Sequence, residues 1–491
     1  MVQRQHIIYF GTRSALLLVL GLCTFFSFGQ QPSSDLPANV LQGTKTDTLD
    51  AYYLIDKVFI VGNKKTKEHI IRRELKIQDG MWIFKPEIDE LLEKEREKVV
   101  NTRLFIEVDI NYLELGGNKI DVIVRVLERW YLFPIPLLEL ADRNFTEWWT
   151  NQNRDLSRLE YGIRLTQYNF RGRNETVNLL AQFGFTKKLA LGYRIPYINR
   201  NQKLGLRFLF SYATNKNTNY RTESHRLQFA DSEETILETF RSNVVFTYRP
   251  NFYSRHAFGM QYDQSSVNDT IQELNPNYFL DTDKKQQYLS IYYQFTADKR
   301  DFVAYPLDGS LFQASIDQKG LGIFDDVAIT TLYASYGKFW DLGKNYYAGS
   351  GIRGMASFPS RQPYNLYQGL GYNQDFIRGY EIYVIEGPQY VLNNNSIKKL
   401  VFSTETDLRN LNISRKFGKI PLSIYLTAFF DQSYVANYPN YNLNTRFSDT
   451  YLFGYGLGVD IVSFYDLVMR FEYSFNKANE SGLRFNISSA F

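Results

Sequence analysis

The sequence contains few of the residues that build disulfide scaffolds and metal centres. Its 491 residues include one cysteine, Cys23, and four histidines that lie far apart in the chain. We expect Cys23 to be removed with the segment around it, so the mature protein would have no thiol. That excludes disulfides, cysteine-ligated metals and a cysteine nucleophile, and the histidine spacing offers no metal site. We therefore expect neither a metal nor any other cofactor.

Proline is also scarce, and neither sign of charge dominates. The chain has 14 prolines, and its 56 lysines and arginines nearly balance 52 aspartates and glutamates. This composition excludes a disordered or collagen-like protein. The charge balance argues against a dedicated nucleic-acid binder, so no nucleic-acid partner is expected. Aromatic residues, in contrast, are abundant: 38 Phe, 37 Tyr and 5 Trp make up 16% of the chain.

Only one stretch, residues 15–28, approaches the length of a membrane helix, and it falls short of the ~20 residues that a spanning helix needs. Two arginines precede it, and small and polar residues follow it, which is the order of a secretory signal. A lipoprotein signal would need a small residue before Cys23, where Leu22 stands. We predict a signal peptide at 1–29, a polar, flexible linker at 30–50, and an exported protein.

Residues 51–130 predict a small α+β domain. Tyr53–Val61 has the pattern of a strand, Thr66 can cap a short helix, and Pro86 stands in the first turn of a second helix. Two alternating strands follow, joined by a turn at 116–118. The order strand, helix, helix, strand, strand predicts a three-stranded sheet with helices on one face. An edge of such a sheet leaves N–H and C=O groups free to pair with an extended segment.

From residue 131 onward, apolar and polar residues alternate instead. In one segment Leu422, Ile424, Leu426, Ala428 and Phe430 alternate with Ser423, Tyr425, Thr427, Phe429 and Asp431. One face suits lipid and the other water. A water-soluble sandwich also alternates, but it needs shorter strands and a cover over its apolar face. Only closure satisfies every backbone group in lipid. The segments number sixteen or seventeen, and bacterial barrels have even numbers, so we predict a mainly β fold: a transmembrane antiparallel β-barrel of 16 strands over 131–491.

One stretch of the predicted barrel, residues 359–398, shows little alternation. Structureless stretches beyond ~15 residues are uncommon unless they are functional. This stretch contains the sequence DFIRGYEIY, in which Arg378, Gly379 and Tyr380 follow one another, and Arg378 is the only basic residue from 362 to 397. We therefore treat this loop as a candidate functional segment.

The chain ends in GLRFNISSAF. Gly482 is followed by Phe485, Ile487 and the terminal Phe491, which share one register. A glycine, alternating apolar residues and a final aromatic residue have the form of an outer-membrane assembly signal. An ordinary last strand is the alternative, but the final aromatic in the correct register favours the assembly signal.

Two parts of the sequence resemble known families. VFIVGNKKTKEHIIRREL, within 51–130, resembles the start of a POTRA (polypeptide-transport-associated) domain. A single POTRA-like domain, the loop with Arg378, five closing strands and the terminal aromatic together resemble the BamA/TamA superfamily of outer-membrane insertases and translocases. This resemblance covers nearly all of the mature chain.

The resemblance implies that the loop folds back into the barrel and that Arg378 pairs with an acid on the inner wall. Asp431, in LTAFFDQSYV, matches the family's aromatic-x-Asp-x-Gly strand motif, except that Ser433 stands in place of the glycine. Glu405 and Asp407 share a lumen-facing register and are further candidates. A guanidinium that bonds a carboxylate through two donors fixes both the orientation and the depth of the loop.

The alternation also places Gly454, Gly456 and Gly458 on the inner wall. Missing side chains there would leave room for the tip of a loop. The alternative is a solvated surface loop with an incidental arginine, and glycines that serve the curvature of the barrel.

No pattern points to an enzyme. GSGIRG at 349–354 matches the dinucleotide fingerprint formally, but it lies in an alternating strand with no helix after it. No serine elbow or Walker loop occurs in the sequence. We expect a protein that is not an enzyme.

The resemblance implies a protein of the Gram-negative outer membrane, with its POTRA-like domain in the periplasm, that inserts other barrel proteins or translocates a polypeptide. A weak seam between a first strand at 131–139 and a last strand at 483–491 would expose backbone groups to an incoming strand. Pro134 and Pro136, in the first strand, cannot donate ladder hydrogen bonds. The partners implied are unfolded outer-membrane or secreted client proteins, periplasmic chaperones or accessory subunits, and membrane lipid.

Two other classes of function stay open. One is a passive outer-membrane channel or a structural subunit that docks a periplasmic partner. The other is a barrel-attached exporter of lipid or polysaccharide.

Overall fold

The computed structural model describes residues 51–140, 148–149, 153–199, 201–280, 284–324, 327–372, 375–407, 419–463 and 467–488. The predicted signal peptide, 1–29, and linker, 30–50, lie outside the described residues, as does the C-terminal Phe491.

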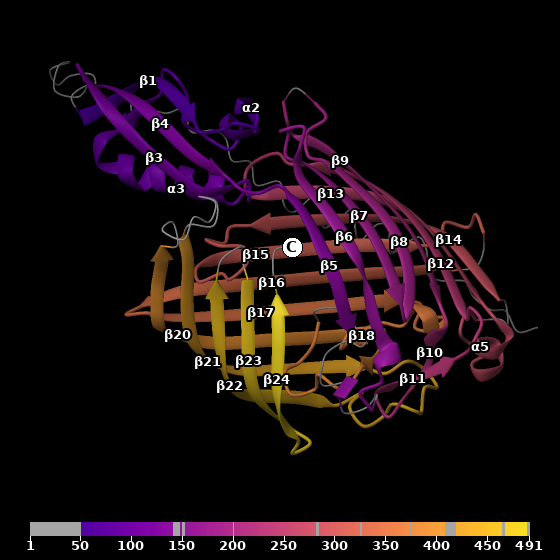
Figure 1. Cartoon of the computed structure of the whole chain (residues 1–491). Helices are drawn as coiled ribbons and strands as arrows, with labels where there is room; N and C mark the ends of the chain where they lie inside the picture. Colours follow the sequence, from indigo (N-terminus) through magenta and orange to yellow (C-terminus); the bar gives the residue numbers. More distant parts are fainter. Residues whose placement is uncertain are drawn as a thin grey trace, which may run out of the picture.

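The N-terminal domain is a four-stranded sheet with helices packed against it (Figure 1). Its elements are β1 (Tyr52–Val61), α2 (Glu68–Arg72), β2 (Trp82–Phe84), η2 (Lys85–Glu87), α3 (Ile88–Val100), β3 (Phe105–Gly116) and β4 (Lys119–Glu128). The strand order is β2-β1-β4-β3, with β1 parallel to β4 and the other pairs antiparallel. The predicted count of three strands was wrong, because β2 has only three residues and is too short for alternation to be visible.

The start of helix α2 also differs from the prediction. Lys67 precedes the helix without a side-chain cap, and the hydroxyl of Thr66 instead donates to the carboxylate of Glu128 at 2.7 Å. The same carboxylate accepts from the backbone N–H groups of Lys65 and Thr66. Because the Glu128 carboxylate is buried, it needs hydrogen-bond donors, and this turn supplies them. The Thr66 hydroxyl therefore bonds Glu128 and does not cap the helix.

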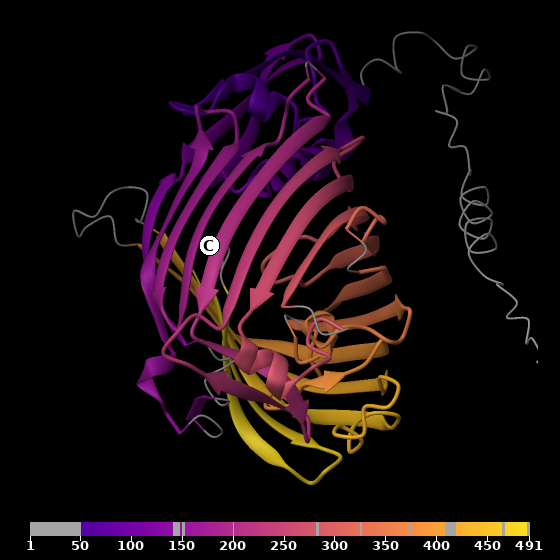
Figure 2. The same ribbon diagram turned by 90° about the vertical axis from the view of Figure 1, so that its right-hand side faces the viewer.

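The rest of the chain forms one antiparallel sheet of sixteen strands that curls into a barrel (Figures 1 and 2). The strands are β5 (Leu132–Leu140), β6 (Leu159–Phe170), β7 (Glu175–Gly184), β8 (Thr186–Ile195), β9 (Leu204–Asn215), β12 (Leu237–Tyr248), β13 (Ser254–Val267), β14 (Lys285–Asp298), β15 (Gly309–Lys319), β16 (Ile329–Gly343), β17 (Tyr346–Phe358), β20 (Gln389–Asp407), β21 (Lys419–Ala436), β22 (Tyr451–Ser463), β23 (Leu467–Asn476) and β24 (Ser481–Ser488). Each pairs with its neighbour in chain order. The predicted fold class and strand number are confirmed.

Short elements lie in the connections between these strands. They are η3 (Leu156–Arg158), the hairpin of β10 (Asn217–Glu223) and β11 (Arg226–Asp231), α5 (Asp269–Leu274), η4 (Tyr364–Leu366), and the pair β18 (Gly369–Leu370) and β19 (Ile385–Glu386). Figure 2 shows the N-terminal domain over one end of the barrel, and the β10–β11 hairpin and α5 at the opposite end. We call these the domain end and the loop end.

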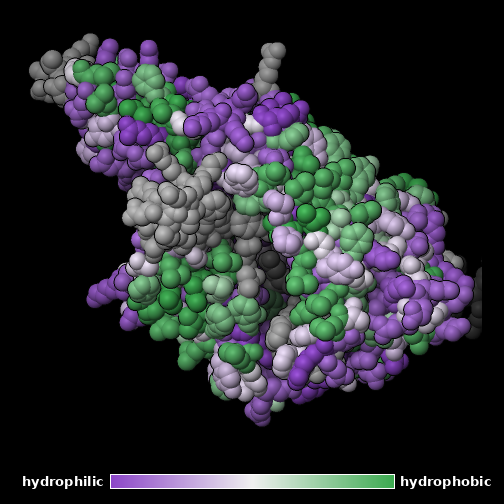
Figure 3. All heavy atoms as spheres, viewed as in Figure 1, coloured by the Kyte–Doolittle hydropathy of each residue, from purple (hydrophilic) through white to green (hydrophobic). Residues whose placement is uncertain are grey.

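The two faces of the barrel wall differ as the alternation predicts. On β21, Leu426 and Phe430 are 50% and 42% exposed on the outside, whereas Tyr425 and Asp431 on the inside are buried. Figure 3 shows apolar side chains spread over the outside of the barrel strands. Among the described residues, no helix is long and apolar enough to cross a bilayer.

The N-terminal domain is fixed to the barrel rim by an ion pair with a buried carboxylate. Glu74, which follows α2 and is 2% exposed, accepts two hydrogen bonds of 3.0 Å from Arg249, beyond the end of β12. Arg73 lies 3.9 Å over the ring of Tyr197, which follows β8. The backbone of Gly172, between β6 and β7, lies so close to the carbonyl of Lys65 that a Cβ would come within 2.1 Å of it. These contacts set the position of the domain over the domain end.

Candidate functional site

The loop singled out by sequence runs from residue 359 to 388, because β17 ends at Phe358 and β20 begins at Gln389. The predicted limit of 398 was wrong. Residues 389–398 pair with β17 and β21 as regular strand. Their alternation is hidden by three consecutive asparagines at 393–395, which make both faces polar.

Arg378 lies inside the barrel and bonds the inner wall. Its Nε and Nη2 donate to the two carboxylate oxygens of Asp431 at 2.7 and 2.6 Å. Nη1 donates to Glu472 on β23 at 3.3 Å, and Nη2 also donates to the carbonyl of Asn395 on β20 at 3.1 Å. The guanidinium carbon lies 4.0 Å from the ring centroid of Phe429. One arginine therefore links β20, β21 and β23 through charge-assisted hydrogen bonds.

Gly379 and Gly454 allow the loop to lie directly on the wall. Gly379 has φ of 95°, and its carbonyl accepts from the side chain of Asn476 at 2.8 Å. A Cβ on Gly454 would come within 1.8 Å of the carbonyl oxygen of Arg378. At Gly456 a Cβ would come within 2.1 Å of the carbonyl oxygen of Tyr473 and 2.6 Å of the ring of Phe429, and at Gly458 within 2.9 Å of the Cγ of Glu472. The three glycines thus clear space for the loop and for the side chains that bind Arg378.

Tyr380 and Glu381 extend the contact to the last strands. The hydroxyl of Tyr380, which is 2% exposed, accepts from the backbone amide of Lys477 at 3.3 Å. The carboxylate of Glu381 accepts from Arg484 on β24 at 3.0 Å. The tip of the loop therefore touches strands from β20 to β24, the last five of the barrel.

The other predicted acids lie elsewhere. Glu405 is exposed near the domain end of β20, away from the Arg378 contacts at Asn395. Asp407 is the last residue of that strand and pairs in register with Lys419, and its side chain lies outside the described residues. Neither is among the contacts of Arg378 that the described residues show. The register gave both acids a lumen-facing position, but only Asp431 also lies at the depth of the loop.

The residues of the predicted assembly signal form the outer edge of the sheet. Phe485 is 43% exposed on the outside of β24, and its ring lies 4.7 Å from that of Phe471 on β23. Gly482 pairs in register with Ser474, and Ile487 with Met469. The C-terminal Phe491 lies outside the described residues.

The sheet leaves two edges unpaired in the part of the chain that the structure describes. There, β5 forms a ladder only with β6, and β24 only with β23. These are the first and last strands of the barrel, and Figure 1 shows them at the two ends of the curled sheet. Figure 3 shows a hollow in the surface between the two walls. We call this junction the seam.

A second segment enters the barrel from the domain end. Residues 299–308 connect β14 to β15, and within them Tyr305 is 2% exposed. Its hydroxyl donates to Asp460 on β22 at 2.7 Å, and its ring lies 5.0 Å from that of Tyr425 on β21. The connection therefore reaches across to the wall that also holds Arg378.

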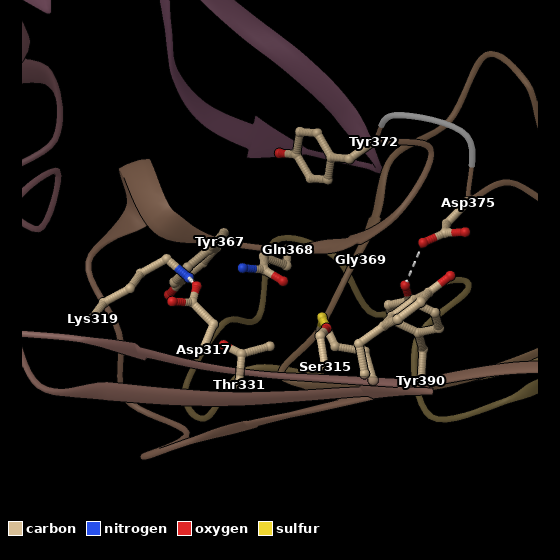
Figure 4. A pocket seen from close by; sticks show the side chains of 12 residues that line it. Ser315, Asp317, Lys319, Thr331, Tyr367, Gln368, Gly369, Tyr372, Asp375 and Tyr390 are labelled. Carbon is tan, nitrogen blue, oxygen red and sulfur yellow. Dashed lines mark hydrogen bonds and ion pairs between the residues drawn. The ribbon is translucent and has the colours of Figure 1, made fainter. Parts of the chain in front are cut away.

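A cavity of about 370 Å³ lies between the inserted loop and the wall of β15, β16, β17 and β20 (Figure 4). Asp317 in this cavity pairs with Lys319 at 2.5 Å. Asp375 pairs with Arg353 at 3.0 Å and accepts from Tyr390 at 2.7 Å. The charged groups at this cavity are therefore already in ion pairs, and we assign the cavity no ligand. Within the described ranges, no three His, Asp or Glu side chains gather in a way that could hold a metal ion.

The sequence reasoning missed several residues of the site. Glu472 alternates into the lumen with Arg470 and Ser474, so its register was visible, but nothing in the sequence sets its depth against Arg378. The pair of Glu381 and Arg484 leaves no sequence pattern, because the two residues come from separate elements.

Comparison with known proteins assigns the family. Residues 169–491 match the Omp85 superfamily domain. The fold is similar to the crystal structure of BamA from Haemophilus ducreyi lacking POTRA domains 1–3, with a TM-score of 0.50 and 14% identity over 89% of this chain and 84% of that one. It is also similar to CdiB from Escherichia coli, with a TM-score of 0.55 and 11% identity over 89% of this chain and 76% of that one. With a barrel of this architecture and a family match over most of its length, the chain belongs to the Omp85 superfamily.

Proposed function

We propose that this protein inserts other barrel proteins into the outer membrane, or moves a polypeptide across it, at the seam between β5 and β24. Membership of the Omp85 superfamily supports insertion or translocation as the general class of function, and the outer membrane of a Gram-negative bacterium as the location. The observation that carries the proposal is the pair of strand edges that form no ladder with each other among the described residues.

The mechanism needs only an exchange of backbone hydrogen bonds. An extended client segment pairs with an unpaired edge by β-augmentation, so its N–H and C=O groups are satisfied before it enters lipid. Each added strand presents a new edge to the next. No nucleotide or cofactor takes part in such an exchange.

The inserted loop would keep one side of the seam in shape. Arg378 and Glu381 connect β20, β21, β23 and β24 through hydrogen bonds of 2.6 to 3.3 Å. Strands connected in this way would move together, so β24 would keep its extended conformation when the seam separates. That is the property a template strand requires.

The N-terminal domain would bring clients or accessory subunits to the barrel from the periplasm. β3 lies at an edge of its sheet and, in the described chain, pairs only with β4. Leu113 and Leu115 near its end are 57% and 49% exposed. An extended segment can add to this edge through main-chain hydrogen bonds, and these side chains would contact its apolar residues.

Depletion of the protein in its native cell tests the function. We expect lower amounts of a set of outer-membrane or secreted proteins, measured by quantitative mass spectrometry of the envelope and the medium. Normal amounts of every other barrel protein and every secreted protein would contradict the proposal. Ion conductance of the purified protein, combined with such a result, would indicate a passive channel.

Locking the seam tests the mechanism separately. Leu138 on β5 and Leu483 on β24 are 74% and 65% exposed, and both lie toward the loop end of their strands. Cysteines at these two positions, bridged by a thiol cross-linker, should abolish the activity of the protein. The matched control bridges Leu138 to Tyr161, its partner in register on β6. Equal activity of the two cross-linked proteins would rule out an opening seam.

A further inference from the structure

Three arginines lie on the inner wall of the barrel, close to the domain end. Arg194 is the last residue but one of β8, and Arg207 and Arg255 lie near the starts of β9 and β13. Three positions from each of them is an apolar side chain exposed on the outside of the same strand: Leu191, Phe210 and Phe258. Strand residues at odd spacings face opposite sides of a sheet, so all three arginines face the lumen.

The fold brings the charges of these arginines together. Arg194 and Arg207 are directly opposite each other in the ladder of β8 and β9. Side chains in such positions have Cβ atoms about 4.5–5.5 Å apart, and like charges there destabilise a sheet. Arg255 lies two strands beyond β9, and its charge acts on both of the others. We call the three residues the arginine cluster.

No carboxylate in the described part of the chain forms an ion pair with the arginine cluster. Asp298 is the acid whose charge reaches Arg255, and its carboxylate already accepts from Arg300 at 2.6 and 2.8 Å. The guanidinium of Arg194 donates to the hydroxyl of Thr176 at 3.4 Å, which is a neutral acceptor. The positive charge of the cluster is therefore not balanced by these neighbours.

Other arginines of the inner wall do have carboxylate partners. Arg241 lies on β12, between the strands of Arg207 and Arg255, and donates to Asp263 at 2.6 Å. Arg484 on β24 donates to Glu381 at 3.0 Å. Because such partners are missing at the arginine cluster, an anion from outside the protein has to balance its charge.

We propose that the arginine cluster is a binding site for a phosphate group. A guanidinium donates parallel hydrogen bonds to two phosphate oxygens, and a phosphate group has enough acceptor oxygens for several guanidinium groups at once. A single carboxylate has only two oxygens, so three converging arginines favour phosphate over an acidic side chain. A bound phosphate also removes the repulsion between Arg194 and Arg207. This site is independent of strand pairing at the seam, and it goes beyond the proposed function.

The site adjoins the contact that holds the N-terminal domain. The charge of Arg249, which bonds Glu74 of that domain, acts on Arg255. Figure 2 shows the N-terminal domain over this end of the barrel. Two kinds of molecule carry the required group at such a place: a soluble phosphate compound and the headgroup of a membrane lipid. Both present the same chemistry to the arginines, so the experiment has one arm for each.

Calorimetric titration of the purified full-length protein in neutral detergent, at constant ionic strength, tests the proposal. One arm adds inorganic phosphate, and the other adds micelles that contain phosphatidic acid, with diacylglycerol micelles as their control. We expect saturable binding. Tighter binding of phosphatidic acid identifies a lipid headgroup, and tighter or equal binding of inorganic phosphate identifies a soluble ligand. No saturable binding in either arm, or an equal response to chloride, would overturn the proposal, because chloride measures general screening.

Variants assign the binding to the arginine cluster. Arg207→Gln and Arg255→Gln should each weaken binding about ten- to hundredfold, the effect of losing a hydrogen bond between charged groups. The matched control is Arg164→Gln on β6, which also faces the lumen because the neighbouring Ile163 is exposed on the outside. Migration of unheated protein on gels checks that each variant is folded. Equal weakening by Arg164→Gln and Arg207→Gln, or unchanged binding in folded Arg207→Gln and Arg255→Gln, would also overturn the proposal.

Discussion

Gly454 of β22 lies directly beneath the backbone carbonyl of Arg378, and a Cβ at this position would come within 1.8 Å of that oxygen. The wall and the inserted loop are therefore in backbone contact at this point. Backbone cannot move aside as the end of a flexible side chain can, so the contact depends on the absence of a side chain.

We expect Gly454→Ala to displace the loop from the wall. The added methyl group cannot fit while Arg378 keeps its bonds to Asp431, so residues 375–388 should become accessible to protease in folded barrels. Gly351→Ala is the control, because the nearest atom to its Cβ would be 3.8 Å away, an ordinary contact. Identical digestion patterns for the two variants would show that Gly454 does not lie against the carbonyl of Arg378.

The pair of Arg378 and Asp431 should behave as one energetic unit. Asp431 is fully buried, so Arg378→Ala leaves an unpaired buried carboxylate and should cost about 3–5 kcal/mol of unfolding free energy. The double variant with Asp431→Asn should cost less than the sum of the single changes. Urea unfolding in lipid vesicles measures the cycle, and additive losses would count against direct coupling.

Tyr305 should hold the connection 299–308 against the opposite wall. Tyr305→Phe removes the hydrogen bond to Asp460, a carboxylate that is 2% exposed. The free energy of unfolding should fall by about 1.5–3 kcal/mol, which is typical of a hydrogen bond to a charged group. Hydrogen exchange of residues 299–308 should rise. Tyr336→Phe, on the outside of the barrel, serves as the control, and equal exchange in the two variants would show that the contact does not anchor this segment.

His225 should make the loop end sensitive to acid. It lies between β10 and β11, and it joins that hairpin to other segments: its Nε2 accepts from the amide of Phe447 at 2.9 Å, and its carbonyl accepts from the amide of Val384 at 2.8 Å. Burial lowers the pKa of His225 to about 4, and the charge of Arg446 acts in the same direction. Protonation would break the bond to Phe447 and place a charge in a buried site.

The sign of the pH effect follows from linkage. Because the folded pKa lies below the ordinary value of ~6.5, the opened form binds the proton first as the pH falls. The stabilising contribution is complete above pH ~6.5 and is lost progressively toward pH 4, by roughly 2 kcal/mol at pH 5. Hydrogen exchange of residues 437–450, corrected for intrinsic rates, should therefore rise from pH 7.5 to 5. His225→Gln should show a flat profile, and a similar rise in that variant would assign the effect to another group.

The alternation along the strands was enough to predict the barrel, because a strand between lipid and water must present opposite faces to them. The count of sixteen strands also needed the rule that bacterial barrels have an even number of strands. It failed where both faces are polar, at Asn393 to Asn395, and where a strand is too short to alternate, at Trp82 to Phe84. The residue type of Thr66 predicted a helix cap, but its hydroxyl donates to the buried carboxylate of Glu128 instead.

For the candidate site, too, some residues were predictable from the sequence and others were not. Register alone placed Asp431, Gly454, Gly456 and Gly458 on the inner wall, and the structure has them there. Register could not choose among the acids that share a face, because the depth of the loop is set by tertiary contacts. Glu472 and the pair of Glu381 and Arg484 became visible only in three dimensions.

The sequence by itself therefore determined the barrel, its inward and outward faces, and the unusual loop around Arg378, because each depends on local composition and period. The tertiary structure alone decided which acid meets Arg378 and how the segment with Tyr305 reaches the opposite wall. Those outcomes depend on how deeply each segment inserts, which is set by strands brought together from distant parts of the chain.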